Sequence, residues 1–191
     1  EGLKVHTIVS DYDFRFQAYI SLWNRPGVSE VKKILSVFKP DIVHAHRVHG
    51  YLSYGSLVAA KKLGAKVFLT SHDVMPFNYG KLVETIDPKD MSVPAHFNWR
   101  VSPLRQFKDS RFRYNPLRNT IIRHILRRYV DKVLAVSDSL KDALEQNGIQ
   151  NVAVVHNGID PEQPEQSDID SFKKKHSVGE RAVFFTGKPV G

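Results

Sequence analysis

The chain alternates between short apolar runs and longer segments in which apolar residues recur every three to four positions. The short runs are rich in Val and Ile and predict β-strands at 3–10, 41–46, 66–71, 132–136 and 152–155. The helical spacing predicts helices at 29–38, 54–63, 119–130 and 140–147. Because strands and helices alternate, we expect an α/β fold, namely a Rossmann-like parallel sheet with helices on both faces.

The pattern changes near residue 160, which suggests a domain boundary. We expect residues 1–159 to form one Rossmann-like domain whose own first strand is missing. Residues 160–180 begin with Pro, Glu and Gln and predict a linker that includes a short helix at 169–176. Residues 181–191 predict the first strand of a second domain, so we expect the chain to be truncated at both ends.

Composition narrows the class of protein. The chain has 191 residues, of which 41% are hydrophobic and 25% charged, as in an ordinary globular domain. No apolar run reaches the roughly 18 residues that a membrane span needs. The chain contains no Cys, which excludes disulfides, thiolate zinc sites and cysteine nucleophiles within it. Glycine-rich phosphate loops and the G-x-S-x-G motif of serine hydrolases are also missing from the sequence.

The positive charge is concentrated in one segment. Residues 100–128 contain nine Lys or Arg and a single acid, so their net charge of +8 equals that of the whole chain. Aromatic residues are interleaved with these cations, a combination typical of surfaces that contact phosphate or lipid. We predict contact with a phospholipid surface, a phosphorylated acceptor or nucleic acid; the alternative is a solvated face. The predicted patch consists of Arg100, Arg105, Arg111, Arg113, Arg118, Arg123, Arg127 and Arg128.

Polar residues follow nearly every predicted strand, where parallel α/β folds bind their ligands. His72 follows the strand at 66–71 and can donate a hydrogen bond to a ligand oxygen, while Asp73 can fix its tautomer or accept from a hydroxyl. His44 and His46 alternate along a strand and therefore share a face, which raises a zinc site as an alternative. Since no obvious third ligand is spaced with them, we favour a pocket lined by His46 and no metal.

Five short motifs follow one another along the chain. They are KPDIVHAH at 39–46, VFLTSHD at 67–73, YVDKVLAVS at 129–137, VVHNGID at 154–160 and FFTGK at 184–188. Each is weak alone, but their order resembles that of the family-four glycosyltransferases of the GT-B fold. The resemblance implies a retaining enzyme that transfers a sugar from a nucleotide-sugar to an acceptor, in a cleft between two Rossmann-like domains.

The resemblance also implies roles for individual residues. His72 would be the catalytic residue, at the donor sugar and its reaction centre, with His46 and Asp73 among the substrate-binding residues. Asn157 and Gly158 would lie at the crossover between the domains. Lys188 stands where the family usually has an Arg for the donor diphosphate, so the charge is kept but the guanidinium fork is lost.

This chain would then be most of the acceptor-side domain, and residues 181–191 would begin the nucleotide-sugar-binding domain. The family's early glycine-rich turn and the acidic pair of the second domain are missing from the sequence, so we expect the chain alone to be inactive. We expect no metal or cofactor, a lipid-linked or anionic acceptor, and a cytoplasmic location with peripheral contact to an anionic membrane. Nucleic acid is not an expected partner. The alternatives are a sugar epimerase or phosphorylase on the same fold, and a non-catalytic anion- or membrane-binding module.

Overall fold

The structure is a computed structural model that describes residues 4–80, 91–92, 97–158 and 163–179. The chain divides into two compact units, residues 1–157 and residues 158–191. The first unit contains the sheet and its helices. Of the second unit, the structure describes mainly one helix, α7 (Gln166–Lys175), which buries no side chain.

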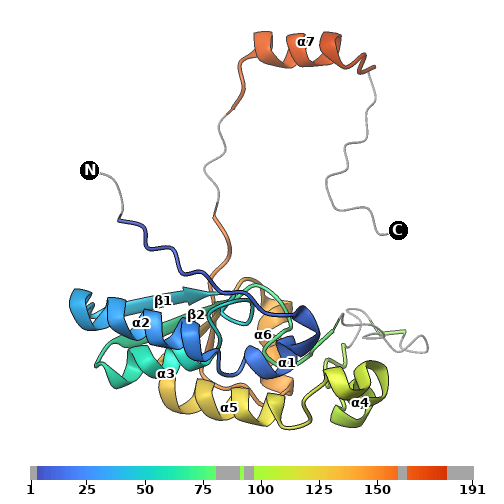
Figure 1. Cartoon of the computed structure of the whole chain (residues 1–191). Helices are drawn as coiled ribbons and strands as arrows, with labels where there is room; N and C mark the ends of the chain where they lie inside the picture. The colour runs from blue at the N-terminus through green and yellow to red at the C-terminus, as the bar shows by residue number, and fades with distance from the viewer. Residues whose placement is uncertain (1–3, 81–90, 93–96, 159–162, 180–191) are drawn as a thin grey trace. The chain divides into compact units, whose positions relative to one another are not determined.

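A four-stranded parallel sheet forms the centre of the first unit (Figure 1). Its strands are β1 (Ile42–His46), β2 (Lys66–Ser71), β3 (Lys132–Ala135) and β4 (Val152–Val154), in the order β1-β2-β3-β4. Each pair runs parallel, with His46 opposite Thr70 and Leu134 opposite Ala153. The parallel α/β arrangement confirms the fold class that the alternating pattern predicts.

Helices precede the first strand and connect the later ones. Their bounds are η1 (Phe14–Phe16), α1 (Gln17–Ile20), α2 (Arg25–Phe38), α3 (Gly55–Lys62), α4 (Pro103–Ser110), η2 (Arg111–Arg113), α5 (Arg118–Tyr129) and α6 (Asp138–Gln146). Two of their ends follow directly from the sequence. Lys39 ends α2 in a left-handed conformation, with φ of 48°, just before Pro40. Ser137 caps α6 by accepting a hydrogen bond from the backbone N–H of Leu140.

Three sequence predictions need correction. Residues 4–10 form no strand, although the run at 3–10 alternates like one. A strand exists only when it pairs with a neighbour, and Val5 and Val9 are 82% and 87% exposed. The helix predicted at 29–38 begins earlier, at Arg25, with Pro26 in its first turn. The sequence shows little periodicity from His72 to Leu117 and predicts no helix there, but the structure places α4 and η2 in this segment. The strand predicted at 181–187 lies outside the described residues.

The two faces of the sheet differ sharply. One face turns Val67, Leu69, Val133 and Ala135 into the hydrophobic core, together with buried residues of α3, α5 and α6. The opposite face shows Ile42, His44 and His46 on β1 as exposed side chains, and continues through half-buried apolar residues on the other strands. In the described part of the chain, the helices therefore pack mainly on one face, whereas the sequence pattern predicts helices on both faces. The half-buried residues are Phe68, Leu134 and Ala153.

Candidate functional site

The carboxyl ends of β1 and β2 bring two histidines into contact. His46 is the last residue of β1, and His72 directly follows β2. Because these strands are parallel and paired in register, both side chains emerge at the same edge of the sheet. Nδ1 of His46 lies 2.9 Å from Nε2 of His72, and both residues are exposed. The structure therefore joins two of the residues that the sequence selects separately.

A third histidine extends this pair into a row. The ring centroids of His44 and His46 lie 4.3 Å apart, and those of His46 and His72 lie 5.2 Å apart. Nε2 of His44 is 2.7 Å from the hydroxyl oxygen of Thr70 on the neighbouring strand. Partial desolvation by its neighbours lowers the pKa of the exposed His46, and the nearby His44 and His72 lower it further. A neutral His46 can share one proton with His72 and fix the orientation of its ring.

The carboxylate of Asp73, the residue after His72, contacts Met75 and His49. One oxygen accepts a hydrogen bond of 3.0 Å from the backbone N–H of Met75, and the other lies 3.5 Å from Nε2 of His49. Burial lowers the pKa of His49, although Asp73 acts in the opposite direction. In this structure Asp73 stabilises the loop that presents His72, and its contact with substrate stays a prediction.

The remaining substrate-binding candidates are less defined. Asn157 is exposed beyond the end of β4, and Gly158 is exposed at the start of the second unit. Next to them, Nε2 of His156 lies 3.6 Å from a carboxylate oxygen of Asp138, at the neighbouring strand exit. Lys188 lies outside the described residues, so its expected contact with a diphosphate stays a prediction.

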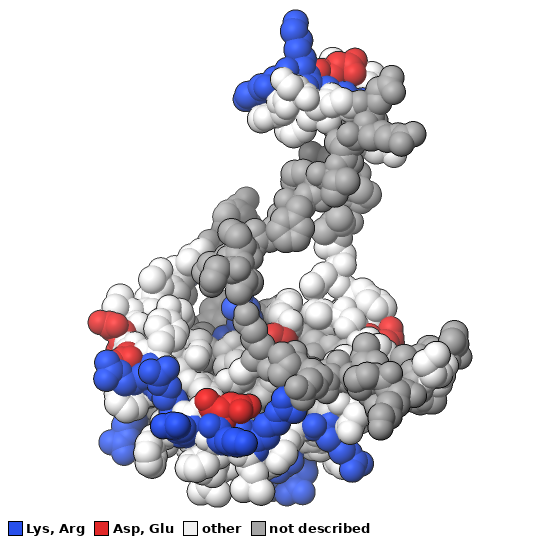
Figure 2. Space-filling model, turned by 90° about the vertical axis from the view of Figure 1, so that its right-hand side faces the viewer, with Lys and Arg blue, Asp and Glu red and all other residues white. Residues whose placement is uncertain are grey.

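Most of the predicted cationic patch is exposed, but one member is not. Figure 2 shows Lys and Arg side chains gathered on one face, with acidic side chains among them. The structure corrects the position of Arg118, whose side chain is 0% exposed at the start of α5. The segment that contains it is basic, but the apolar periodicity of α5 turns this position inward. The exposed members are Arg100, Arg105, Arg111, Arg113, Arg123, Arg127 and Arg128.

The buried side chain of Arg118 lies close to the aromatic side chains of Tyr54, Tyr79 and Tyr114. Its guanidinium is 5.7 Å from the ring centroid of Tyr79, and one of its nitrogens donates to the side-chain oxygen of Asn119 at 3.1 Å. Among the described residues, its Nε and Nη2 have no hydrogen-bond partner. Burial lowers the pKa of Arg118, while Tyr54 and Tyr114 act in the opposite direction. This buried cation is an energetic anomaly that the charge pattern did not predict.

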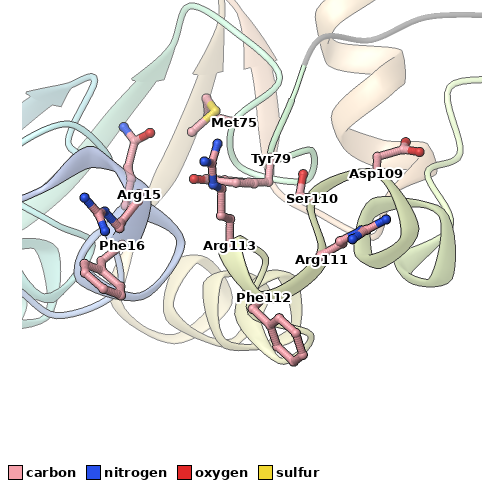
Figure 3. A pocket seen from close by; sticks show the side chains of 10 residues that line it. Arg15, Phe16, Met75, Tyr79, Asp109, Ser110, Arg111, Phe112 and Arg113 are labelled. Atoms are coloured by element: carbon pink, nitrogen blue, oxygen red, sulfur yellow. The ribbon is translucent and has the colours of Figure 1, made fainter.

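A large hollow opens beside the arginines that remain on the surface (Figure 3). Its volume is about 690 Å³, and three separate segments line it. The charge pattern of the sequence indicates Arg111 and Arg113 but gives no sign of Arg15, Met75 and Tyr79. Arg15 is distant in sequence from the basic segment, so only the fold brings it to the other two arginines. A second hollow of about 440 Å³ lies along α5 and includes Arg123 and Arg127.

Neither a metal centre nor a membrane span is found in the part of the chain that the structure describes. In those residues no three or more His, Cys, Asp or Glu side chains are grouped so that they could hold a metal ion. None of the described helices is both long and apolar enough to span a membrane.

The chain is an α/β protein with a parallel sheet, and its histidine row lies at the carboxyl edge, where such folds bind ligands. The family model of glycosyltransferase family 4 matches residues 3–163, which is most of the chain. The chain therefore belongs to glycosyltransferase family 4 and has the transferase fold that its motifs resemble. No curated protein and no solved structure matches the chain significantly.

Proposed function

We propose that this chain is the acceptor-side half of a retaining glycosyltransferase that uses a nucleotide-sugar donor. Membership in the family supports a transferase function in general. The single observation that supports the location of the reaction is the exposed His72 at the carboxyl edge of the sheet, held by His46 at 2.9 Å. In a parallel α/β fold, this edge is where a ligand meets the protein.

In this proposal His72 is the catalytic residue and His46 is a positioning residue. An imidazole N–H of His72 donates to an oxygen of the donor sugar near the bond that breaks. The hydrogen bond between the two rings restricts the rotation of His72, so that less orientational freedom is lost when substrate binds. Asn157 and Gly158 form the crossover to the donor-binding domain, and Lys188 neutralises part of the donor diphosphate.

The proposal includes neither a metal nor another cofactor. His44 and His46, the pair that raises a zinc alternative, already contact Thr70 and His72 through ring nitrogens. We therefore expect transfer by the complete enzyme to continue at an unchanged rate in excess EDTA. A loss of activity that added Zn²⁺ or Mg²⁺ restores would contradict this part of the proposal.

The partners in this proposal are a nucleotide-sugar donor and an anionic or lipid-linked acceptor. Seven exposed arginines between residues 100 and 128 support an anionic partner. We place the enzyme in the cytoplasm, with peripheral contact to an anionic membrane, and we do not expect nucleic acid to be a partner.

The proposal is tested by His72→Ala in a protein that contains both GT-B domains. We expect a loss of roughly hundredfold or more in turnover, because the substitution removes a hydrogen-bond donor at the reacting centre. His156→Ala is the matched control, since His156 is also an exposed histidine at a strand exit. If His72→Ala retained full turnover, the catalytic role of His72 would be refuted.

Product analysis separates this function from the alternatives. The complete enzyme is incubated with a panel of nucleotide-sugars, and the products are identified by mass spectrometry. A glycosylated acceptor with retained anomeric configuration supports the proposal, whereas an epimerised nucleotide-sugar or a sugar phosphate supports an epimerase or a phosphorylase. The chain of 191 residues is assayed in parallel, and measurable transfer by it alone would contradict its assignment as half an enzyme.

A further inference from the structure

The hollow of about 690 Å³ has a composition suited to one kind of ligand (Figure 3). Arg15 and Phe16 belong to η1, and Met75 and Tyr79 come from the loop after β2. The remaining wall is residues 109–113, at the end of α4 and in η2. The hollow therefore collects three arginines from two segments that are far apart in the sequence.

Two of these arginines have no carboxylate partner among the residues that the structure describes. Arg15 pairs with Asp13, and Asp109, which also lines the hollow, lies 3.9 Å from Arg105. Within the described residues, no carboxylate lies within ion-pair distance of Arg111 or Arg113, and both are exposed. Unpaired guanidinium groups with fork geometry are suited to bidentate contact with phosphate oxygens.

The walls of the hollow are held by contacts between elements. The hydroxyl of Tyr19 donates to the backbone oxygen of Phe112 at 3.2 Å, which joins α1 to η2. The side chain of Gln106 is buried and accepts a hydrogen bond of 2.9 Å from the backbone N–H of Tyr79. Arg111 has a φ of 47°, in the left-handed region that non-glycine residues rarely adopt. Such backbone strain is concentrated at functional sites, where the surrounding structure maintains it.

The rim of the hollow is apolar as well as cationic. Phe112 is 87% exposed, and Figure 3 shows its ring extending outward from the arginines. Leu104 and Phe107 on α4 are also exposed large apolar residues close by in the sequence. Phosphate contact at the arginines, with apolar contact at the rim, matches a ligand whose phosphate is attached to an apolar group.

We propose that this hollow is a phosphate-binding site built from Arg15, Arg111 and Arg113. The identity of the ligand rests on the proposed function, under which it is the phosphate-bearing acceptor. The phosphate site itself does not rest on that function. The phosphate belongs either to a lipid headgroup at a membrane surface or to a soluble phosphate compound. Both sources use the same arginines, but only the lipid source uses the exposed Phe112.

The site is tested by binding of two probes to the chain. The probes are inorganic pyrophosphate, measured by calorimetry, and phosphatidic acid in phosphatidylcholine vesicles, measured by co-sedimentation. Arg111→Gln with Arg113→Gln should weaken the binding of at least one probe by tenfold or more. Arg127→Gln with Arg128→Gln removes the same charge from α5 and should change binding by less than about twofold. Circular dichroism confirms that both double variants remain folded.

Two outcomes would overturn the proposal. Equal losses in the two double variants would show a general electrostatic effect, and binding of neither probe by the unaltered chain would exclude the site. Phe112→Ser identifies the source: loss of vesicle binding alone supports a lipid headgroup, and unchanged binding of both probes supports a soluble phosphate. His72→Ala should bind the probes normally, so failure of the phosphate site and failure of the proposed catalytic role would appear in different variants.

Discussion

At the residue scale, two separate sequence motifs contribute to one site. His44 and His46 come from the motif at 39–46, and His72 comes from the motif at 67–73. Neither motif indicates that Nδ1 of His46 and Nε2 of His72 lie 2.9 Å apart. That contact depends on the register of two parallel strands. The residues themselves could be predicted because polar side chains at strand exits are typical of ligand-binding α/β folds.

The lowered pKa values of two histidines predict how stability responds to acid. The pKa of His46 and that of His49 both lie below the ordinary value, mainly because of desolvation, which is partial at the exposed His46 and stronger at the buried His49. The unfolded chain therefore binds protons first, and folding should become less favourable as the pH falls from about 7 to about 5. Urea unfolding at several pH values measures this loss. His46→Asn with His49→Asn should reduce the pH dependence, and an unchanged pH dependence in this double variant would contradict the prediction.

Arg118 predicts an unusual response to substitution. Its buried guanidinium has two nitrogens without a hydrogen-bond partner among the described residues, so removing its charge should cost little. We expect Arg118→Met to keep the free energy of unfolding within about 1 kcal/mol, because Met fills most of the same volume. Arg118→Ala should lose about 2–4 kcal/mol, since it leaves a cavity.

Chemical denaturation of both Arg118 variants measures the difference. If Arg118→Met were as unstable as Arg118→Ala, the cation itself would be stabilising, through Tyr79 and the neighbouring tyrosines. The charge pattern predicts Arg118 to lie on the surface, because its neighbours in the sequence are also basic. Whether Arg118 is buried depends on which side of α5 it faces and on the elements that pack there. The number of charges in a segment indicates neither.

At the element scale, a carboxylate at the start of β3 joins three elements. Asp131 lies 2.7 Å from Nζ of Lys61, at the end of α3, and accepts a hydrogen bond of 2.8 Å from the backbone N–H of Val67 on β2. These hydrogen bonds lower the pKa of Asp131. Their stabilising effect is therefore present above an ordinary carboxyl pKa of about 4 and is lost as the pH falls below it.

We expect Asp131→Asn to lower the free energy of unfolding by about 1–3 kcal/mol at neutral pH, because it removes charge-assisted hydrogen bonds. Thermal or urea unfolding measures this change. Asp142→Asn, an exposed carboxylate on α6, is the control and should change stability by less than about 0.5 kcal/mol. A similar loss in both variants would mean that net charge, rather than the contact with Lys61, determines the effect.

Most of the alternating strands and helices could be predicted from the sequence, because the residue patterns that form them are local. The strand at 66–71 and the end of α2 before Pro40 follow from β-branched runs and from the missing N–H of proline. The strand at 3–10 failed because pairing is a property of two segments. Helix α4 was missed because its exposed Leu104 and Phe107 obscure the helical pattern.

At the scale of the whole molecule, every core residue that the structure describes lies in the first unit. The core residues fall between Leu22 and Val152, whereas α7 buries no side chain. We therefore expect a chain that ends at Asn157 to unfold at nearly the same urea concentration as the chain of 191 residues. A fall in the midpoint by more than about 1 M would contradict this, since it would require substantial burial by residues 158–191.

The half-uncovered face of the sheet has a practical consequence for handling this chain. Ile42 is 60% exposed on β1, an end strand of the described sheet, on the same face as half-buried Phe68 and Leu134. Apolar side chains at an edge strand promote self-association as protein concentration rises. A lysine in place of Ile42 should therefore delay aggregation in concentrated samples without touching the histidine row.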